Sequence, residues 1–109
     1  MQKDYYIAEF EELVLLAILK LGSGAYGAAI HELLEDAGRR TAIGALYTTL
    51  SRLEEKGLIA SWMGESTPER GGRAKKFFKV LASGQRALRK AGTTRARLAN
   101  EAPAMGGAF

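Results

Sequence analysis

The sequence predicts a mainly α-helical fold with one small β-hairpin. Three observations predict it: an apolar helical segment near the start, two further segments with apolar residues three and four apart, and two short β-prone runs that flank a turn containing proline and glycine. At 109 residues, 47% of them hydrophobic, the chain has room for one domain with a small core. A second subunit would usefully extend that core.

Residues 10–21 form the first predicted helix. Leu, Ala and Glu favour helix in this segment, and Gly22-Ser23-Gly24 ends it. Apolar residues occur on nearly every side, so the helix must be buried from two directions. In a chain this short, we expect one side to face the domain core and the other a partner subunit.

Two further helices follow. Residues 26–37 carry apolar side chains at spacings of three and four, with Gly38 as the C-terminal stop. Residues 41–56 form the third helix, with Thr41 as its N-cap and Gly57 as its end. The predicted inward stripe of this third helix consists of Ile43, Leu46, Leu50 and Leu53.

The second half of the chain begins with the hairpin. Residues 58–62 and 75–80 suit short strands, and the chain is helical again over about residues 83–98. Three helices, a hairpin and a further helix are the order of a winged helix-turn-helix domain. We therefore assign residues 1–82 to such a domain, 83–101 to a C-terminal helix and 102–109 to a flexible tail.

Positive charge is concentrated in the second half. Residues 1–60 carry six Lys or Arg against nine Asp or Glu, whereas residues 61–109 carry ten against three. A solvated basic face is one interpretation and a polyanionic partner is the other. Within residues 70–79 no acid interrupts the basic residues Arg70, Arg73, Lys75, Lys76 and Lys79. Such a loop can hold phosphates, and its arginines can enter a narrow minor groove.

The third helix has a small, polar outer face. The residues that point away from its apolar stripe are Gly44, Thr48, Ser51, Arg52 and Glu55. A helix that enters the DNA major groove, about 12 Å wide, needs small side chains in its first turns. Thr48, Ser51 and Arg52 can hydrogen-bond to base edges. Tyr47 lies at the border of the stripe, where it is either a phosphate contact or a half-buried core tyrosine.

Other chemistries are not expected. Residues 22–27 satisfy G-x-G-x-x-G, but they follow a helix, whereas a dinucleotide-binding turn follows a strand. His31 has no second histidine or cysteine with which to share a metal, so we interpret it as a helix-surface residue. We find no nucleophile with a base and an orienting partner. The sequence therefore predicts no enzyme activity, no cofactor and no metal.

Composition also indicates a compartment. The chain has no cysteine, which fits a reducing environment. Its longest apolar run, residues 13–19, is far below the roughly 20 residues of a membrane span and follows acidic rather than basic residues. We expect a cytoplasmic protein with no signal peptide and no membrane anchor.

Four blocks of the sequence carry a family pattern. They are residues 10–19 (FEELVLLAIL), Ala25-Tyr26-Gly27, residues 68–78 (PERGGRAKKFF) and residues 44–59 (GALYTTLSRLEEKGLI), of which the last is the most specific. Through these blocks the chain resembles the PadR-like transcriptional regulators over about residues 10–88. The resemblance implies a homodimeric bacterial repressor whose third helix enters the major groove and whose wing contacts flanking DNA. It also implies that Tyr47 contacts the DNA backbone.

The resemblance and the residue patterns together give the expected sites. The predicted contacts to double-stranded DNA, in an inverted-repeat operator, are Tyr26, Thr41, Gly44, Tyr47, Thr48, Ser51, Arg52, Arg70, Arg73, Lys75 and Lys76. Members with one C-terminal helix dimerise through that helix and the first one, which implies an interface of Phe10, Leu13, Val14, Ala17, Leu88, Ala91 and Leu98. The alternative function is a winged-helix protein-interaction module that does not read DNA. A small-molecule inducer of unknown identity is left open.

Two departures from the family pattern concern the last helix. The family usually has a capping Thr three residues before the glycine matching Gly84, whereas this chain has Leu81, which leaves Ser83 as the expected cap. Some short members bind planar drugs with an aromatic residue on this helix, but residues 84–102 contain none. The single tryptophan, Trp62, is expected to pack within the wing. The sequence therefore gives no support for a drug-stacking pocket.

Overall fold

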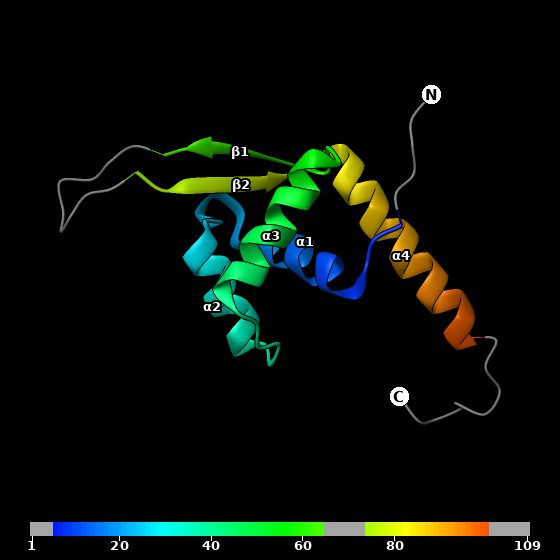
Figure 1. Cartoon of the computed structure of the whole chain (residues 1–109). Coiled ribbons are helices and arrows are strands. Elements are labelled where there is room, and N and C mark those ends of the chain that lie inside the picture. The colour runs from blue at the N-terminus through cyan, green and yellow to red at the C-terminus, as the bar shows by residue number, and fades with distance from the viewer. Residues whose placement is uncertain (1–5, 65–73, 101–109) are drawn as a thin grey trace.

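The computed structural model describes residues 6–64 and 74–100. Three helices come first, α1 (Glu9–Leu21), α2 (Gly27–Asp36) and α3 (Ile43–Glu55), with a short 3-10 turn, η1 (Gly22–Gly24), between α1 and α2. The antiparallel strands β1 (Ile59–Met63) and β2 (Lys76–Val80) form the wing, and α4 (Ala82–Asn100) follows (Figure 1). The predicted mainly α-helical fold with a small hairpin, arranged as a winged helix, is confirmed.

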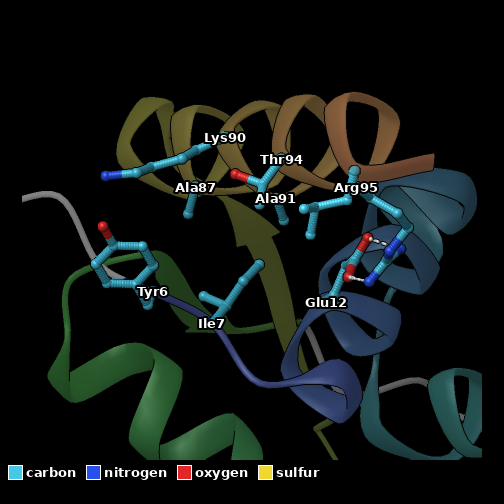
Figure 2. A pocket seen from close by; sticks show the side chains of 9 residues that line it. Tyr6, Ile7, Glu12, Ala87, Lys90, Ala91, Thr94 and Arg95 are labelled. Carbon is cyan, nitrogen blue, oxygen red and sulfur yellow. Dashed lines mark hydrogen bonds and ion pairs between the residues drawn. The ribbon is translucent and has the colours of Figure 1, made fainter. Parts of the chain in front are cut away.

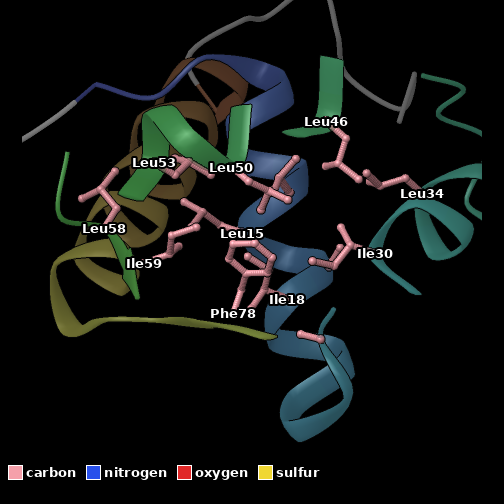
Figure 3. Close-up of a cluster of buried hydrophobic side chains, with 13 residues drawn as sticks. Leu15, Ile18, Ile30, Leu34, Leu46, Leu50, Leu53, Leu58, Ile59 and Phe78 are labelled. Carbon is pink, nitrogen blue, oxygen red and sulfur yellow. The ribbon is translucent and has the colours of Figure 1, made fainter. Parts of the chain in front are cut away.

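Helix α1 lies at the centre of the molecule and packs against α2, α3, β2 and α4. The buried side chains of the core come from α1, α2, α3 and the wing region, as Figure 3 shows; they include Leu15, Ile18, Ile30, Leu34, Leu46, Leu50, Leu53, Leu58, Ile59 and Phe78. A single contiguous core of this kind holds the two helices of the helix-turn-helix and the wing in one arrangement.

Helix α3 differs from its prediction at its start. Ile43 was expected in the inward stripe, but its side chain is 46% exposed, and Thr49 is buried alongside Leu46, Leu50 and Leu53 instead. The predicted N-cap is also wrong. The N-cap residue is Ala42. Thr41 makes other contacts: its N–H donates to the Glu35 carboxylate at 3.0 Å, and its hydroxyl donates to the Ala42 carbonyl.

The turn between α2 and α3 is held from α2. Gly38 has a φ of +93°, a left-handed conformation that suits glycine. His31 is half-buried, and its Nε2 donates to the Thr41 carbonyl oxygen at 2.8 Å. The histidine that was interpreted as an ordinary surface residue therefore fixes the entry to α3. At the other end of α3, Gly57 has a φ of +74° and stands just after the helix, as predicted.

The wing is pinned to the segment that precedes α2. The Phe78 N–H donates to the Ala25 carbonyl at 2.8 Å, and Tyr26 forms an isolated bridge with Phe77. Phe77 packs edge-on to Tyr26, with ring centroids 5.7 Å apart, and stacks on Trp62 of the neighbouring strand at 5.8 Å. The prediction that Trp62 packs within the wing is confirmed.

Helix α4 has two unlike halves. Near its start, a Cβ at Gly84 would overlap the Leu58 carbonyl oxygen, and Ala87 is buried. Ser83 is not the cap, since it lies inside the helix and its hydroxyl donates to the Gly57 carbonyl at 2.6 Å. Residues 92–100 are exposed throughout, and this half projects from the rest of the molecule (Figure 1).

Three ion pairs tie the acidic start of α1 to other elements. Glu9 meets Arg39 at 3.3 Å, Glu11 meets Lys56 at 2.7 Å, and Glu12 meets Arg95 of α4 at 2.7 Å. Burial raises the pKa of Glu11, but the hydrogen bonds from Lys56 and the Ala8 N–H, with the charges of Lys56 and Arg52, lower it below its ordinary value overall. The Glu12 carboxylate raises the pKa of Arg95 by hydrogen bonding and charge.

No helix within residues 6–64 and 74–100 is long and apolar enough to cross a membrane.

Candidate nucleic-acid interface

A concave surface forms where α2, α3 and the wing meet. It has a volume of about 290 Å³, and its lining residues are Tyr26, Gly27, Ala28, Tyr47, Ala74, Lys75 and Lys76. Within the described part of the chain, none of these lining residues is acidic. The fold thus brings the predicted contacts Tyr26, Tyr47, Lys75 and Lys76 together from three separate elements.

Tyr47 lies across the start of α2. A Cβ added at Gly27 would overlap the Tyr47 hydroxyl and the adjoining ring carbons, so glycine at this position lets the tyrosine ring lie against the start of α2. The ring remains 46% exposed. Tyr47 thus packs against α2 on one side and is exposed on the other, which fits the border position that the helical periodicity predicted for it.

Lys75 is held beside Tyr26. Its Nζ lies 4.2 Å from the centroid of the Tyr26 ring, within cation–π distance, and the ring is itself supported by Phe77. Lys76 approaches Glu54 at 3.9 Å, but both side chains are well exposed and such a pair contributes little. The wing therefore presents two exposed ammonium groups at the edge of the concave surface.

The outer face of α3 is exposed where it was predicted to be. Gly44, Thr48, Ser51 and Arg52 all have exposed side chains or backbone. One polar group is already used, since the Thr48 hydroxyl donates to the Gly44 carbonyl at 3.0 Å. Ser51 and Arg52 are thus the polar side chains of this face that stand ready to donate.

One further predicted DNA contact, Thr41, does not join this surface in the structure. Thr41 lies in the turn before α3, where Glu35 and Ala42 engage it. Arg70 and Arg73 lie outside the described residues, so their role stays a prediction.

The predicted dimer face needs a correction at one position. Val14 has no exposed surface, so it belongs to the core of the single chain, whereas Ala17, 5% exposed, lines an open apolar groove beside α1. Phe10, Leu13, Leu88 and Ala91 are half-buried and Leu98 is 65% exposed. Leu16 and Leu19 of α1, which the predicted dimer face does not include, are 46% and 45% exposed. The all-round apolar pattern predicted a second apolar face but did not show which residues form it.

A cavity of about 320 Å³ lies between the N-terminal segment, α1 and α4 (Figure 2). Its lining residues are Tyr6, Ile7, Glu12, Ala87, Lys90, Ala91, Thr94, Arg95 and Leu98. Arg95 donates two hydrogen bonds to Glu12 at one end, and Lys90 lies 4.4 Å from the centroid of the Tyr6 ring at the other. The aromatic side chain of this cavity, Tyr6, comes from the segment before α1, whereas the prediction of no drug-stacking pocket rested on the lack of aromatic residues in the last helix.

These features define the class of the protein as a winged helix-turn-helix protein with an exposed third helix, a wing and a basic concave surface between them. The model of the transcriptional regulator PadR-like family matches residues 15–90, which is more than half of the chain. The chain belongs to this family, which supports transcription regulation and DNA binding. A comparison with curated proteins gave no match.

Solved structures agree with this assignment. A PadR-like transcription factor from Bacteroides fragilis is 25% identical, with 88% of each chain covered and a TM-score of 0.75. A PadR family regulator from Eggerthella lenta is 27% identical, with 93% of this chain and 88% of the other covered and a TM-score of 0.68. A Streptococcus transcriptional regulator, 23% identical over 90% of this chain and 92% of its own, shares the fold at a TM-score of 0.70.

Proposed function

We propose that the protein is a homodimeric transcriptional repressor of the bacterial cytoplasm that binds an inverted-repeat operator. In each subunit α3 enters the major groove and the wing contacts the flanking backbone. The observation that carries the proposal is the concave surface, because it joins the start of α2, the exposed Tyr47 and two wing lysines without an acidic side chain among its described lining residues.

The chemistry of this surface suits a phosphate of the DNA backbone. Lys75 and Lys76 supply positive charge, and the Tyr47 hydroxyl supplies a hydrogen-bond donor at the rim. The helix α2 begins at Gly27, so its positive dipole end lies at the same place. A backbone contact here would set the register of α3 in the groove without itself reading sequence.

The exposed half of α4 supports dimerisation. Residues 92–100 are all exposed in the single chain, although Arg95 pairs with Glu12 of α1, and Leu98 is 65% exposed. An open apolar groove also lies between α1 and α2, lined by Leu13, Leu16, Ala17, Lys20, Leu33, Leu34 and Ala37. We place the partner's last helix against α1 and α4 of this subunit. The two α3 helices would then stand about one turn of DNA, or roughly 34 Å, apart.

Salt-dependent binding tests the backbone contact. Lys75→Ala should weaken binding to a promoter fragment of the chain's own gene and reduce the log–log salt slope by about 0.9 for each lost phosphate contact, hence about 1.8 for a dimer. Fluorescence anisotropy titrations at salt concentrations from about 50 to about 200 mM measure this slope. Arg89→Ala, which removes an exposed cation of α4, is the control. An unchanged slope for Lys75→Ala would remove this lysine from the contact set.

Sedimentation tests the dimer. Leu16→Glu places a charge on the exposed apolar side of α1, so it should convert the dimer to a monomer while leaving the helical circular dichroism spectrum intact. Glu32→Gln, at an exposed position of α2, is the control. A wild-type protein that sediments as a monomer at micromolar concentration would contradict the proposed dimer.

A winged-helix module that docks an acidic protein is the second candidate, and the exposed wing lysines favour it equally. Failure to shift any promoter fragment at low salt would favour this candidate over the repressor. A small-molecule inducer also remains a proposal. The cavity between Tyr6, α1 and α4 is where we place it, because a ligand there would touch both the expected dimerisation helix and α1.

A further inference from the structure

The first turn of α3 presents an exposed apolar surface. Ala42, Ile43, Gly44 and Ala45 are all exposed, and Ile43 shows 46% of its surface. A single exposed isoleucine is ordinary in a soluble protein. This one differs in its place, because it stands one helical turn before Tyr47, on the side of α3 that borders the basic concave surface.

The hydroxyl groups around this turn are already engaged with the backbone. Thr41 donates its hydroxyl to the Ala42 carbonyl at 3.3 Å, and Thr48 donates its own to the Gly44 carbonyl at 3.0 Å. The polar side chains of the outer face that remain, Ser51, Arg52 and Glu55, lie about two to three turns further along the helix. The N-terminal turn of α3 is therefore equipped for van der Waals contact rather than for hydrogen bonding.

We infer that Ile43 selects thymine by packing against its C5-methyl group in the major groove. The inference rests on the proposed function. Among the chemical groups that base pairs show in the major groove, this methyl group is the apolar one. A β-branched side chain in a helix has one strongly preferred rotamer, so Ile43 meets the methyl group with little loss of freedom. Each operator half-site would then carry a T·A pair opposite the start of α3.

Deoxyuridine tests the contact directly, because it removes the methyl group and keeps every hydrogen-bonding edge of thymine. Two versions of the same promoter fragment, made with thymidine or with deoxyuridine, are titrated with the full-length protein. One methyl contact in each half-site should weaken binding of the deoxyuridine DNA about 16-fold, which is about fourfold, or about 0.8 kcal/mol, for each buried methyl group.

Variants show whether Ile43 makes the contact. Ile43→Ala should weaken binding to thymidine DNA. For this variant, the dissociation constant for deoxyuridine DNA divided by that for thymidine DNA should be at least about fourfold smaller than for the wild type. Ile43→Val, which keeps most of the side chain, should retain most of the ratio. Ser51→Ala is the matched control on the same helix, because it should weaken binding to both DNAs equally.

The outcomes separate this inference from the proposed function. Tight binding that ignores deoxyuridine overturns the inference alone, as does an Ile43→Ala ratio that stays within about twofold of the wild-type ratio. A lower Ile43→Ala ratio with an intact Ser51→Ala ratio supports it. Absence of binding to either DNA, for protein with native circular dichroism, overturns the repressor proposal and the inference with it.

Discussion

Helix α3 and the wing meet at one concave surface, yet they are anchored to different depths. Four α3 residues, Leu46, Thr49, Leu50 and Leu53, are buried in the core. The wing reaches the same core through Ile59 and Phe78, whereas its outer part is held by the stacking of Trp62, Phe77 and Tyr26. The position of α3 is thus inseparable from the fold, whereas the outer part of the wing can change with a modest loss of stability.

The largest effect should come from the anchor of α3. Leu46→Ala removes a fully buried side chain and should lower the free energy of unfolding by about 2 to 5 kcal/mol. Ile43→Ala, one turn earlier and exposed, should cost less than about 1 kcal/mol. Urea denaturation followed by circular dichroism measures both. Equal losses would show that α3 is not anchored as the buried stripe indicates.

A smaller effect is expected in the wing. Phe77→Ala removes the half-buried ring between Tyr26 and Trp62 and should cost roughly 2 kcal/mol. The emission of Trp62, the single tryptophan, should shift to the red as its stacking partner disappears. If the emission shifts to the red with no loss of helical signal, the outer part of the wing can loosen while α3 stays in place. Co-operative loss of both signals at lower urea would argue against it.

The smallest effect concerns the far end of α3, where Lys56 pairs with Glu11. Glu11→Gln should cost about 1 kcal/mol at pH 7, because solvent screens the half-exposed lysine. The pKa of Glu11 is lowered in the folded protein, so its contribution is fully present above the unfolded value of about 4.3 and is lost as the pH falls through the lower folded value. Urea melts at pH 7 and near pH 3 should therefore show the difference shrinking. A constant difference would mean that the charge of Glu11 is not involved.

Much of the fold was predictable because its elements carry local signals. The end of α1 at Gly22, the end of α3 before Gly57 and the two strands within a residue or so follow from glycine placement and apolar periodicity. The exposed positions of Thr48, Ser51 and Arg52 follow from the same periodicity. These features depend on residues that are close in sequence.

The errors lie where a distant residue decides. Glu35 captures the Thr41 N–H and Gly57 accepts the Ser83 hydroxyl, so neither predicted cap could be judged from its own helix. Ile43 has the spacing of the apolar stripe, but it lies in the first turn of α3, beyond the buried core, and is exposed. Val14 could not be distinguished from Leu16 and Leu19 in a helix that is apolar on most sides. The convergence of Tyr26, Tyr47 and Lys75 also required the packed structure.

The close approach of Tyr47 to Gly27 has a consequence for how this surface can evolve. A methyl group at position 27 would displace the exposed phenol ring rather than the backbone, because the atoms it meets are the far end of that side chain. Gly27→Ala should therefore cost the fold little while it moves the Tyr47 hydroxyl away from its place beside α2, and it should lose that effect once a small residue replaces the tyrosine. A substitution at position 27 thus acts on the concave surface through Tyr47 and not through the backbone.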